Sequence, residues 1–164
     1  MKLVHYSETP FELDRTKSYK DANDIHNNPL KPRGLWLSDD SQELNWPSWC
    51  RSEDWRTYAL RFGTEFKLKS SANVLILKDP TDVRDFIDVY TNEGSHSWSP
   101  PNWKLVSEVW DGIFITPYTR SFIMGWYLSW DVSSGCVWNL DILEEVQRFE
   151  QVMLSDSQII KGEN

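Results

Sequence analysis

Short apolar runs separated by polar turns set the main limit on what this sequence can fold into. The clearest of these runs, which predict strands, are residues 2–6, 34–38, 73–78 and 112–116. The expected helices are fewer and short, and they do not alternate regularly with the strands. A doubly wound parallel sheet is therefore disfavoured. The sequence predicts an α+β fold with a mixed, mostly antiparallel sheet and short flanking helices.

One helix start is well marked. Asp79 can accept hydrogen bonds from the first helical N–H groups, and Pro80 suits the first helical position, so we expect a helix over about 80–90. Asn102 is expected to begin a second short helix in the same way. Further helices are predicted at 45–55 and 141–152, and further strands at 57–62, 65–69, 125–130 and 135–139.

Composition narrows the class of protein. A chain of 164 residues predicts one domain over 1–164, with the last ten or so residues frayed. The net charge of -8 disfavours a general nucleic-acid-binding surface, because phosphate binding needs clustered Lys and Arg. Two cysteines cannot form a disulfide scaffold, no apolar run approaches the ~20 residues of a membrane span, and no signal peptide is found. We therefore expect a cytoplasmic protein without membrane contact.

The stretch from Leu30 to Cys50 is the best candidate for a ligand pocket. Its short apolar run ends at Ser38, and Trp46 and Trp49 follow after a polar turn. A strand that delivers one hydroxyl and several aromatic faces to one place can grip a flat ligand. The alternative is an edge strand whose aromatic side chains only fill the core, and the residues alone leave both interpretations open.

Few other residues suggest chemistry. His5 lies on the first predicted strand, where a structural role is the alternative to a catalytic one. Asp111 precedes Gly112 at the start of a strand, and Asp131 follows Trp130 at the end of one. Each carboxylate is a candidate catalytic group, and for each the alternative is a turn or capping residue. The spacing of the histidines predicts no metal site.

Several short stretches resemble the ADP-ribosyltransferase fold, especially its diphtheria-toxin-like branch with a His-Tyr-Glu site. Residues 3–7, Leu-Val-His-Tyr-Ser, resemble the first-strand motif, and residues 34–38, Gly-Leu-Trp-Leu-Ser, resemble the second. Residues 110–113, Trp-Asp-Gly-Ile, and the stretch 135–142 are similar to later strands of bacterial and phage members. The resemblance therefore implies an ADP-ribosyltransferase-like fold, with NAD as substrate and a toxin or defence role.

The resemblance also implies roles for individual residues. His5, with Tyr6 beside it, would hold the NAD ribose and the nicotinamide amide. Trp36 stands in the place of the second-strand Tyr and would stack on nicotinamide. Trp49 falls where the branch often has another stacking aromatic, and Ser38 would donate a hydrogen bond to the carboxamide.

The late-strand Glu of the branch falls near Ser134, which is not acidic. Asp131, or else Asp111, would then supply the carboxylate that stabilises the oxocarbenium-like centre formed when the nicotinamide–ribose bond breaks.

Two functions of different classes follow. The first is a mono-ADP-ribosyltransferase or NAD-cleaving enzyme that acts on an unknown macromolecular acceptor. The second is a non-catalytic acidic interaction module on the same fold, either an inhibitor or a nucleic-acid mimic, which the missing Glu favours.

Overall fold

The structure, a computed structural model, describes residues 1–17, 19, 30–91, 99–122 and 125–151. Within these residues, seven strands form one sheet: β1 (Leu3–Ser7), β2 (Leu35–Asp39), β3 (Phe62–Leu68), β4 (Val74–Leu77), β5 (Gly112–Ile115), β6 (Ser134–Val137) and β7 (Leu143–Glu150). Their order across the sheet is β4-β5-β6-β2-β1-β3-β7. The β4–β5 pair is parallel and the other neighbouring pairs are antiparallel, so the prediction of an α+β fold with a mostly antiparallel sheet is confirmed.

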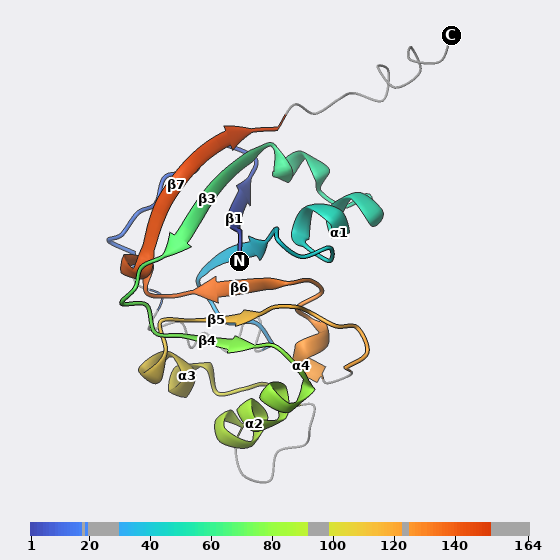
Figure 1. Ribbon diagram of the computed structural model, residues 1–164, viewed down its shortest axis with the longest axis vertical. Helices are drawn as coiled ribbons and strands as arrows, with labels where there is room; N and C mark the ends of the chain where they lie inside the picture. Colours follow the sequence, from blue (N-terminus) through green and yellow to red (C-terminus); the bar gives the residue numbers. More distant parts are fainter. Residues whose placement is uncertain (18, 20–29, 92–98, 123–124, 152–164) are drawn as a thin grey trace.

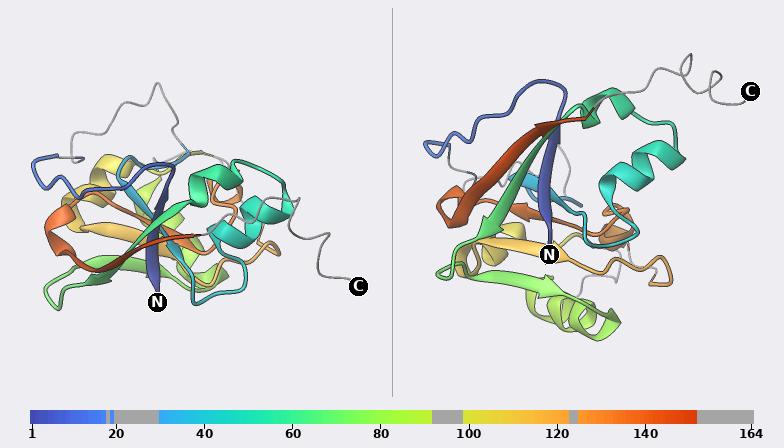
Figure 2. Two further views of the ribbon diagram at one scale, coloured as in Figure 1. Left: turned by 90° about the horizontal axis from the view of Figure 1, so that it is seen from above. Right: turned by 45° about the horizontal axis from the view of Figure 1, so that its top comes forward.

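Short helices flank the sheet: α1 (Trp46–Ser52), α2 (Pro80–Tyr90), α3 (Trp103–Val109) and α4 (Gly125–Leu128), with 3₁₀ turns η1 (Thr57–Leu60) and η2 (Leu140–Ile142). In Figure 1, α2, α3 and α4 lie on the β4 side of the sheet, whereas α1 lies beside β1. In the same view β1, β3 and β7 run steeply and β4, β5 and β6 run across it, so the sheet is strongly twisted (Figures 1 and 2).

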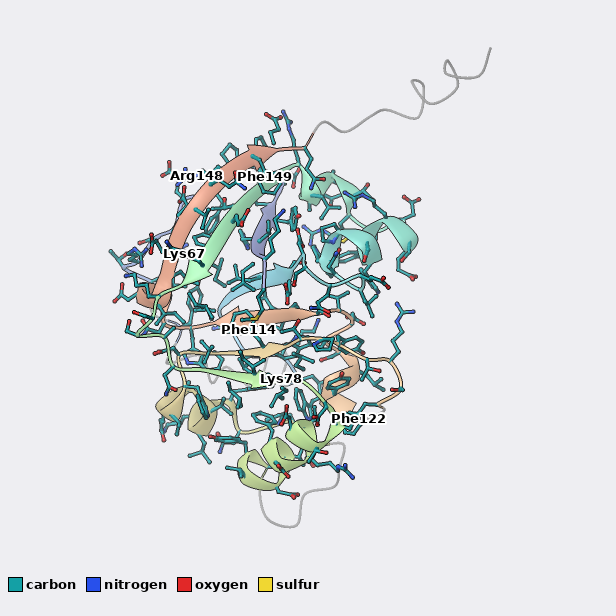
Figure 3. The ribbon with its side chains drawn as sticks, viewed as in Figure 1. Lys67, Lys78, Phe114, Phe122, Arg148 and Phe149 are labelled. Atoms are coloured by element: carbon teal, nitrogen blue, oxygen red, sulfur yellow. The ribbon has the colours of Figure 1, made fainter. Side chains whose placement is uncertain are left out.

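Each face of the sheet carries its own hydrophobic core. On one face, Ile113 and Ile115 pack against the aromatic side chains of α2 and α4, including Phe86 and Trp126. On the other face, Phe114 packs with Leu3 and the residues around η2. Figure 3 shows Phe114 in the middle of the sheet. The alternation along β5 follows from the two-residue period of a strand, and it lets this short strand, which lies between β4 and β6, contribute to both cores.

The predicted helix starts are confirmed. The Asp79 side chain accepts hydrogen bonds from the N–H groups of Thr81 and Asp82, and Pro80 follows it at the start of α2. The Asn102 side chain accepts a hydrogen bond from the Leu105 N–H at the start of α3. Helix α1 begins with a capping box in which Asn45 and Ser48 bond to each other's backbone. These local polar contacts are readable from sequence because both partners lie within one helical turn.

Three secondary-structure predictions are wrong. The helix predicted over 141–152 is largely strand β7. A bulge opposite Glu65 and Phe66 breaks the alternation of apolar and polar residues along this strand. Leu143, Val146 and Phe149 therefore recur every three residues, a spacing that suggested a helix. The strand predicted over 125–130 holds helix α4, whose Trp126 contacts Trp130 at a helical spacing of four.

The strand predicted over 57–62 is mostly η1, and β3 instead runs through Gly63 without interruption. Gly63 has no side chain, and the Phe149 ring on the neighbouring strand covers it. The predicted fraying of the last ten or so residues falls on a segment outside the described residues. Two of the three histidines, His26 and His96, also lie outside the described residues.

Among the described residues, no helix is long and apolar enough to span a bilayer.

Candidate functional site

A pocket of about 310 Å³ opens where β1 and β2 separate. Leu3 pairs with Asp39 and Val4 pairs with Ser38. Beyond these pairs, His5 and Tyr6 on β1 and Trp36 and Leu37 on β2 line the pocket. We call this site the aromatic pocket. Its polar and aromatic lining comes from His5, Tyr6, Lys31, Trp36, Ser38, Trp46, Trp130 and Ser134, and its aliphatic lining from Val4, Leu37 and Val132. Its volume is at the lower end of the usual range for small-ligand sites, about 300–1,000 Å³.

His5 is held by a specific hydrogen bond at the point where the strands separate. Its Nδ1 lies 3.0 Å from the backbone carbonyl oxygen of Trp36, and its ring packs against Phe11 with centroids 4.3 Å apart. A carbonyl oxygen only accepts, so Nδ1 carries the proton, and Nε2 of the neutral ring is an acceptor. Burial lowers the pKa of His5, although the bond to the Trp36 carbonyl opposes that effect. The neutral ring with an acceptor at Nε2 is therefore the form favoured at neutral pH.

Trp36 forms one wall of the aromatic pocket. Its ring lies 4.7 Å from that of Trp130, which is buried and donates through Nε1 to the Ser134 carbonyl oxygen at 3.1 Å. The Lys31 ammonium lies 5.5 Å from the Trp36 ring centroid, in a cation–π contact. The Trp36 ring thus packs against the buried Trp130 ring and also contacts a cation.

Ser38 and Tyr6 are both tied to Asp40, a residue that the sequence did not single out. Ser38 Oγ donates to one Asp40 carboxylate oxygen at 2.7 Å, and the Tyr6 hydroxyl donates to the other. The Ser38 oxygen also accepts the Trp46 backbone N–H at 3.1 Å. Burial raises the pKa of Asp40, partly offset by these two hydrogen bonds, and burial also raises the pKa of Tyr6. The Ser38 proton is already used, so this side chain offers an acceptor rather than the donor expected from the resemblance.

The two tryptophans of α1 take different places. Trp46 lines the aromatic pocket, whereas Trp49 is not among its lining residues and stacks on Trp46 with centroids 5.2 Å apart. Trp55 contacts both rings edge-on and is 43% exposed. Trp49 therefore supports the pocket wall from behind, and Trp46 is the residue in position to stack on a ligand.

The two candidate carboxylates differ in their relation to the pocket. Asp131 lies between two lining residues, Trp130 and Val132, in a left-handed backbone conformation (φ 67°). Its carboxylate is 3.7 Å from the Lys31 ammonium, which itself lines the pocket. Burial raises the pKa of Asp131, and the Lys31 charge partly offsets this effect. Asp131 is therefore a rim residue.

Asp111 lies outside the pocket. Its carboxylate accepts hydrogen bonds from the Asn73 backbone N–H at 2.9 Å and from Asn139 Nδ2 at 2.7 Å. It precedes Gly112 at the start of β5, whereas the pocket residue Ser134 pairs with Ile115 at the other end, about 10 Å away. Asp111 therefore links the segment before β4 to the segment after β6, which is a structural contact between distant parts of the chain.

Three of the polar and aromatic lining residues, Lys31, Trp130 and Ser134, were not predicted as site residues from the sequence. Lys31 and Ser134 carried no motif of their own, although Ser134 stands where the resemblance places an acidic residue. Trp130 was assigned to a strand, and an aromatic run gives no sign of which ring faces a cavity. Among the described residues, no group of three or more His, Cys, Asp or Glu side chains is arranged to hold a metal ion.

The structure is an α+β domain with an aromatic pocket between β1 and β2. No protein-family model, curated protein or solved structure matches the chain.

The lowered pKa of His5 predicts a pH dependence of stability. In the unfolded chain this ring titrates near its ordinary value of 6.5, whereas in the folded protein it stays neutral to lower pH. As pH falls from 6.5 towards the folded pKa, the unfolded state gains protons first, so stability is lost in that window and is fully present above it. A tenfold difference in proton affinity between the folded and unfolded states corresponds to about 1.4 kcal/mol. Urea unfolding of wild type and His5→Asn should show their difference shrinking below pH 6.5. A difference that does not change with pH would contradict this account.

Proposed function

We propose that this protein binds NAD with its nicotinamide end in the aromatic pocket and cleaves the nicotinamide–ribose bond, passing ADP-ribose to a macromolecular acceptor or to water. One observation carries the proposal. His5 and Trp36, which come from separate segments, line one pocket of ligand size together with Trp46 and Trp130. His5 and Trp36 are groups that the resemblance to ADP-ribosyltransferases assigns to NAD binding, whereas Trp46 lines the pocket instead of the expected Trp49.

The chemistry of cleavage fits the residues present. When the bond between the ribose C1′ and the pyridinium nitrogen breaks, nicotinamide leaves as a neutral molecule and positive charge develops on the ribose. Indole faces favour the cationic ring before cleavage. His5 Nε2 can accept a hydrogen bond from a ribose hydroxyl. Asp131 is the proposed carboxylate that stabilises the developing charge. Its ion pair with Lys31 would have to open for Asp131 to approach the ribose, with the Lys31 ammonium moving away or pairing with the substrate phosphates.

The second candidate is a non-catalytic interaction module. It is favoured by a specific observation: within the part of the chain that the structure describes, no Asp or Glu lines the aromatic pocket, and Ser134 stands where the resemblance expects Glu. Such a protein would keep a pocket without the carboxylate needed for cleavage. Its acidic surface, with a net charge of -8, would serve a basic partner.

Thermal unfolding with added NAD, combined with an assay of nicotinamide release, tests the proposal. At an NAD concentration about 100 times the dissociation constant, a binder gains about 2.7 kcal/mol of stability. We expect both stabilisation and release of nicotinamide. Stabilisation without release would favour the non-catalytic module, and the absence of stabilisation would contradict NAD binding altogether.

A further inference from the structure

An exposed cluster of one arginine and two aromatic rings lies at the turn that follows α1. The Arg56 guanidinium carbon lies 5.4 Å from the Trp55 ring centroid and 5.8 Å from the Tyr58 ring centroid. Trp55 is 43% exposed and Tyr58 is 51% exposed, although rings of this size are usually largely buried. We call these three residues the Arg–aromatic cluster. None of them is among the residues that line the aromatic pocket, so the cluster is a separate surface.

The backbone at the cluster holds the Trp55 ring in a defined place at the surface. The two neighbours of Trp55, Asp54 and Arg56, both have left-handed backbone angles, with φ of 48° and 45°. Residues other than glycine adopt this region only at a cost in free energy. The Trp55 N–H donates to the Cys50 carbonyl oxygen at 2.9 Å. The Arg56 carbonyl oxygen accepts the Ala59 N–H at 2.8 Å, so hydrogen bonds fix both sides of this unfavourable turn.

The hydrogen-bonding edge of Arg56 is not used within the part of the chain that the structure describes. No described carboxylate forms an ion pair with Arg56, and no described oxygen accepts a hydrogen bond from its guanidinium. Arg61, by contrast, pairs with Glu150 at 2.8 Å. A guanidinium that is stacked on aromatic rings presents its N–H groups as a planar fork, which matches two oxygens of a carboxylate or a phosphate. Arg56 therefore has the form of an oxyanion receptor.

The charges around the cluster favour a carboxylate over the phosphates of a nucleic acid. Glu53 and Asp54 are both exposed and directly precede Trp55. A single-stranded nucleic acid carries a negative charge at every nucleotide, so its backbone would pass these two carboxylates. The net charge of -8 adds to that repulsion. One Asp or Glu side chain on a protein can meet Arg56 alone, and the rest of such a segment can be apolar.

We propose that the Arg–aromatic cluster is a docking surface for another protein, whose contact segment places an Asp or Glu side chain on Arg56 and an apolar side chain against Trp55 and Tyr58. Trp, Tyr and Arg are the residue types most enriched among those that dominate binding at protein interfaces. The two rings supply the apolar contact, and the free guanidinium fork supplies the directional one. The inference goes beyond the proposed function, because it requires neither NAD binding nor cleavage.

Selection of phage-displayed random 12-residue peptides on the full-length protein tests the proposal. Counter-selection on Trp55→Ala removes peptides that bind elsewhere on the surface. The peptides that survive should carry an Asp or Glu within a few residues of an apolar side chain. The recovery of no such peptide would overturn the proposal, and so would the enrichment of basic peptides. Circular dichroism shows whether Trp55→Ala is folded, and Arg56→Lys takes its place in the counter-selection if it is not.

Arg56→Lys tests the role of the guanidinium fork, because it keeps the positive charge and removes the planar pair of donors. The dissociation constant of a selected peptide, measured by fluorescence anisotropy, should rise about 5-fold for Arg56→Lys and at least about 10-fold for Trp55→Ala. Arg84→Lys, the same change at an exposed position on α2, should leave the constant within about 2-fold.

Replacing the acidic residue of the peptide by its amide completes a double-mutant cycle. The amide peptide should bind wild type and Arg56→Lys with constants within about 2-fold of each other, since the contact with Arg56 is already lost. An undiminished difference between the two proteins would show that Arg56 does not meet the carboxylate and would overturn the proposal.

The other occupants are outcomes of the same test. Binding of a 12-nucleotide oligothymidylate that is lost in Arg56→Lys would assign the cluster to nucleic acid, and a dimer in sedimentation velocity that Trp55→Ala abolishes would assign it to a second copy of the chain. Either result would overturn the proposal. Acidic peptides that bind the cluster without stabilisation by NAD would leave this inference standing while the proposed function fails. Stabilisation by NAD without such peptides would do the reverse.

Discussion

Nicotinamide release from NAD is expected to fall at least about 100-fold in kcat/KM when His5 is replaced by asparagine, with the protein still folded. The amide nitrogen of Asn can take the place of Nδ1 and donate to the Trp36 carbonyl oxygen, so the hydrogen bond between β1 and β2 is kept. The acceptor at Nε2 is lost. The change therefore separates the proposed ligand contact from the structural one, and steady-state kinetics of wild type and variant measure the difference.

His5→Gln is the complementary variant, because its longer side chain can place an amide group near the former Nε2 position. We expect part of the activity to return relative to His5→Asn. Circular dichroism and urea unfolding of both variants control for the fold. If His5→Asn turned over NAD at the wild-type rate, His5 would have only the structural role that was its alternative.

Trp130→Ala is expected to lower the free energy of unfolding by about 3–5 kcal/mol, since truncating a buried Trp leaves a large cavity. Trp130 is 2% exposed, donates to the Ser134 carbonyl oxygen and contacts Trp36, Trp103 and Trp126. It also backs the Trp36 ring, so ligand binding should weaken together with stability. Urea unfolding measures the first effect and NAD titration the second.

Trp55→Ala is the matched control for Trp130→Ala. It removes the same side chain from a site that is 43% exposed and outside the pocket lining, so its cost should be much smaller, about 1 kcal/mol. Equal losses for the two variants would show that Trp130 does not join the core to the pocket wall.

Much of the fold was predictable because its determinants are local. The Asp79 cap, the Asn45 capping box and the short apolar strands each depend on residues a few positions apart. The bulge beside Glu65 and Phe66 was not predictable, because it is a property of the pairing of β3 with β7. The same applies to 125–128, where a short aromatic run suits a strand or a helix and the tertiary packing decides.

The candidate site was predictable where the sequence carried a motif and not where partners meet only in space. The motifs at residues 3–7 and 34–38 pointed to His5 and Trp36, and both line the aromatic pocket. Trp49 was chosen because the resemblance places a stacking aromatic there, and sequence alone does not fix which ring of a short helix faces the pocket. Asp40 was missed because its link to the pocket is the pair of hydrogen bonds that it accepts from Tyr6 on β1 and Ser38 on β2. The contact with Tyr6 exists only in the folded protein.

A crystal structure of the protein soaked with nicotinamide tests the central claim most directly. The account predicts the ring in the aromatic pocket against Trp36, its carboxamide nitrogen within about 3.2 Å of a lining acceptor such as Ser38 Oγ or His5 Nε2. Nicotinamide bound elsewhere on the protein, with the aromatic pocket empty, would contradict it.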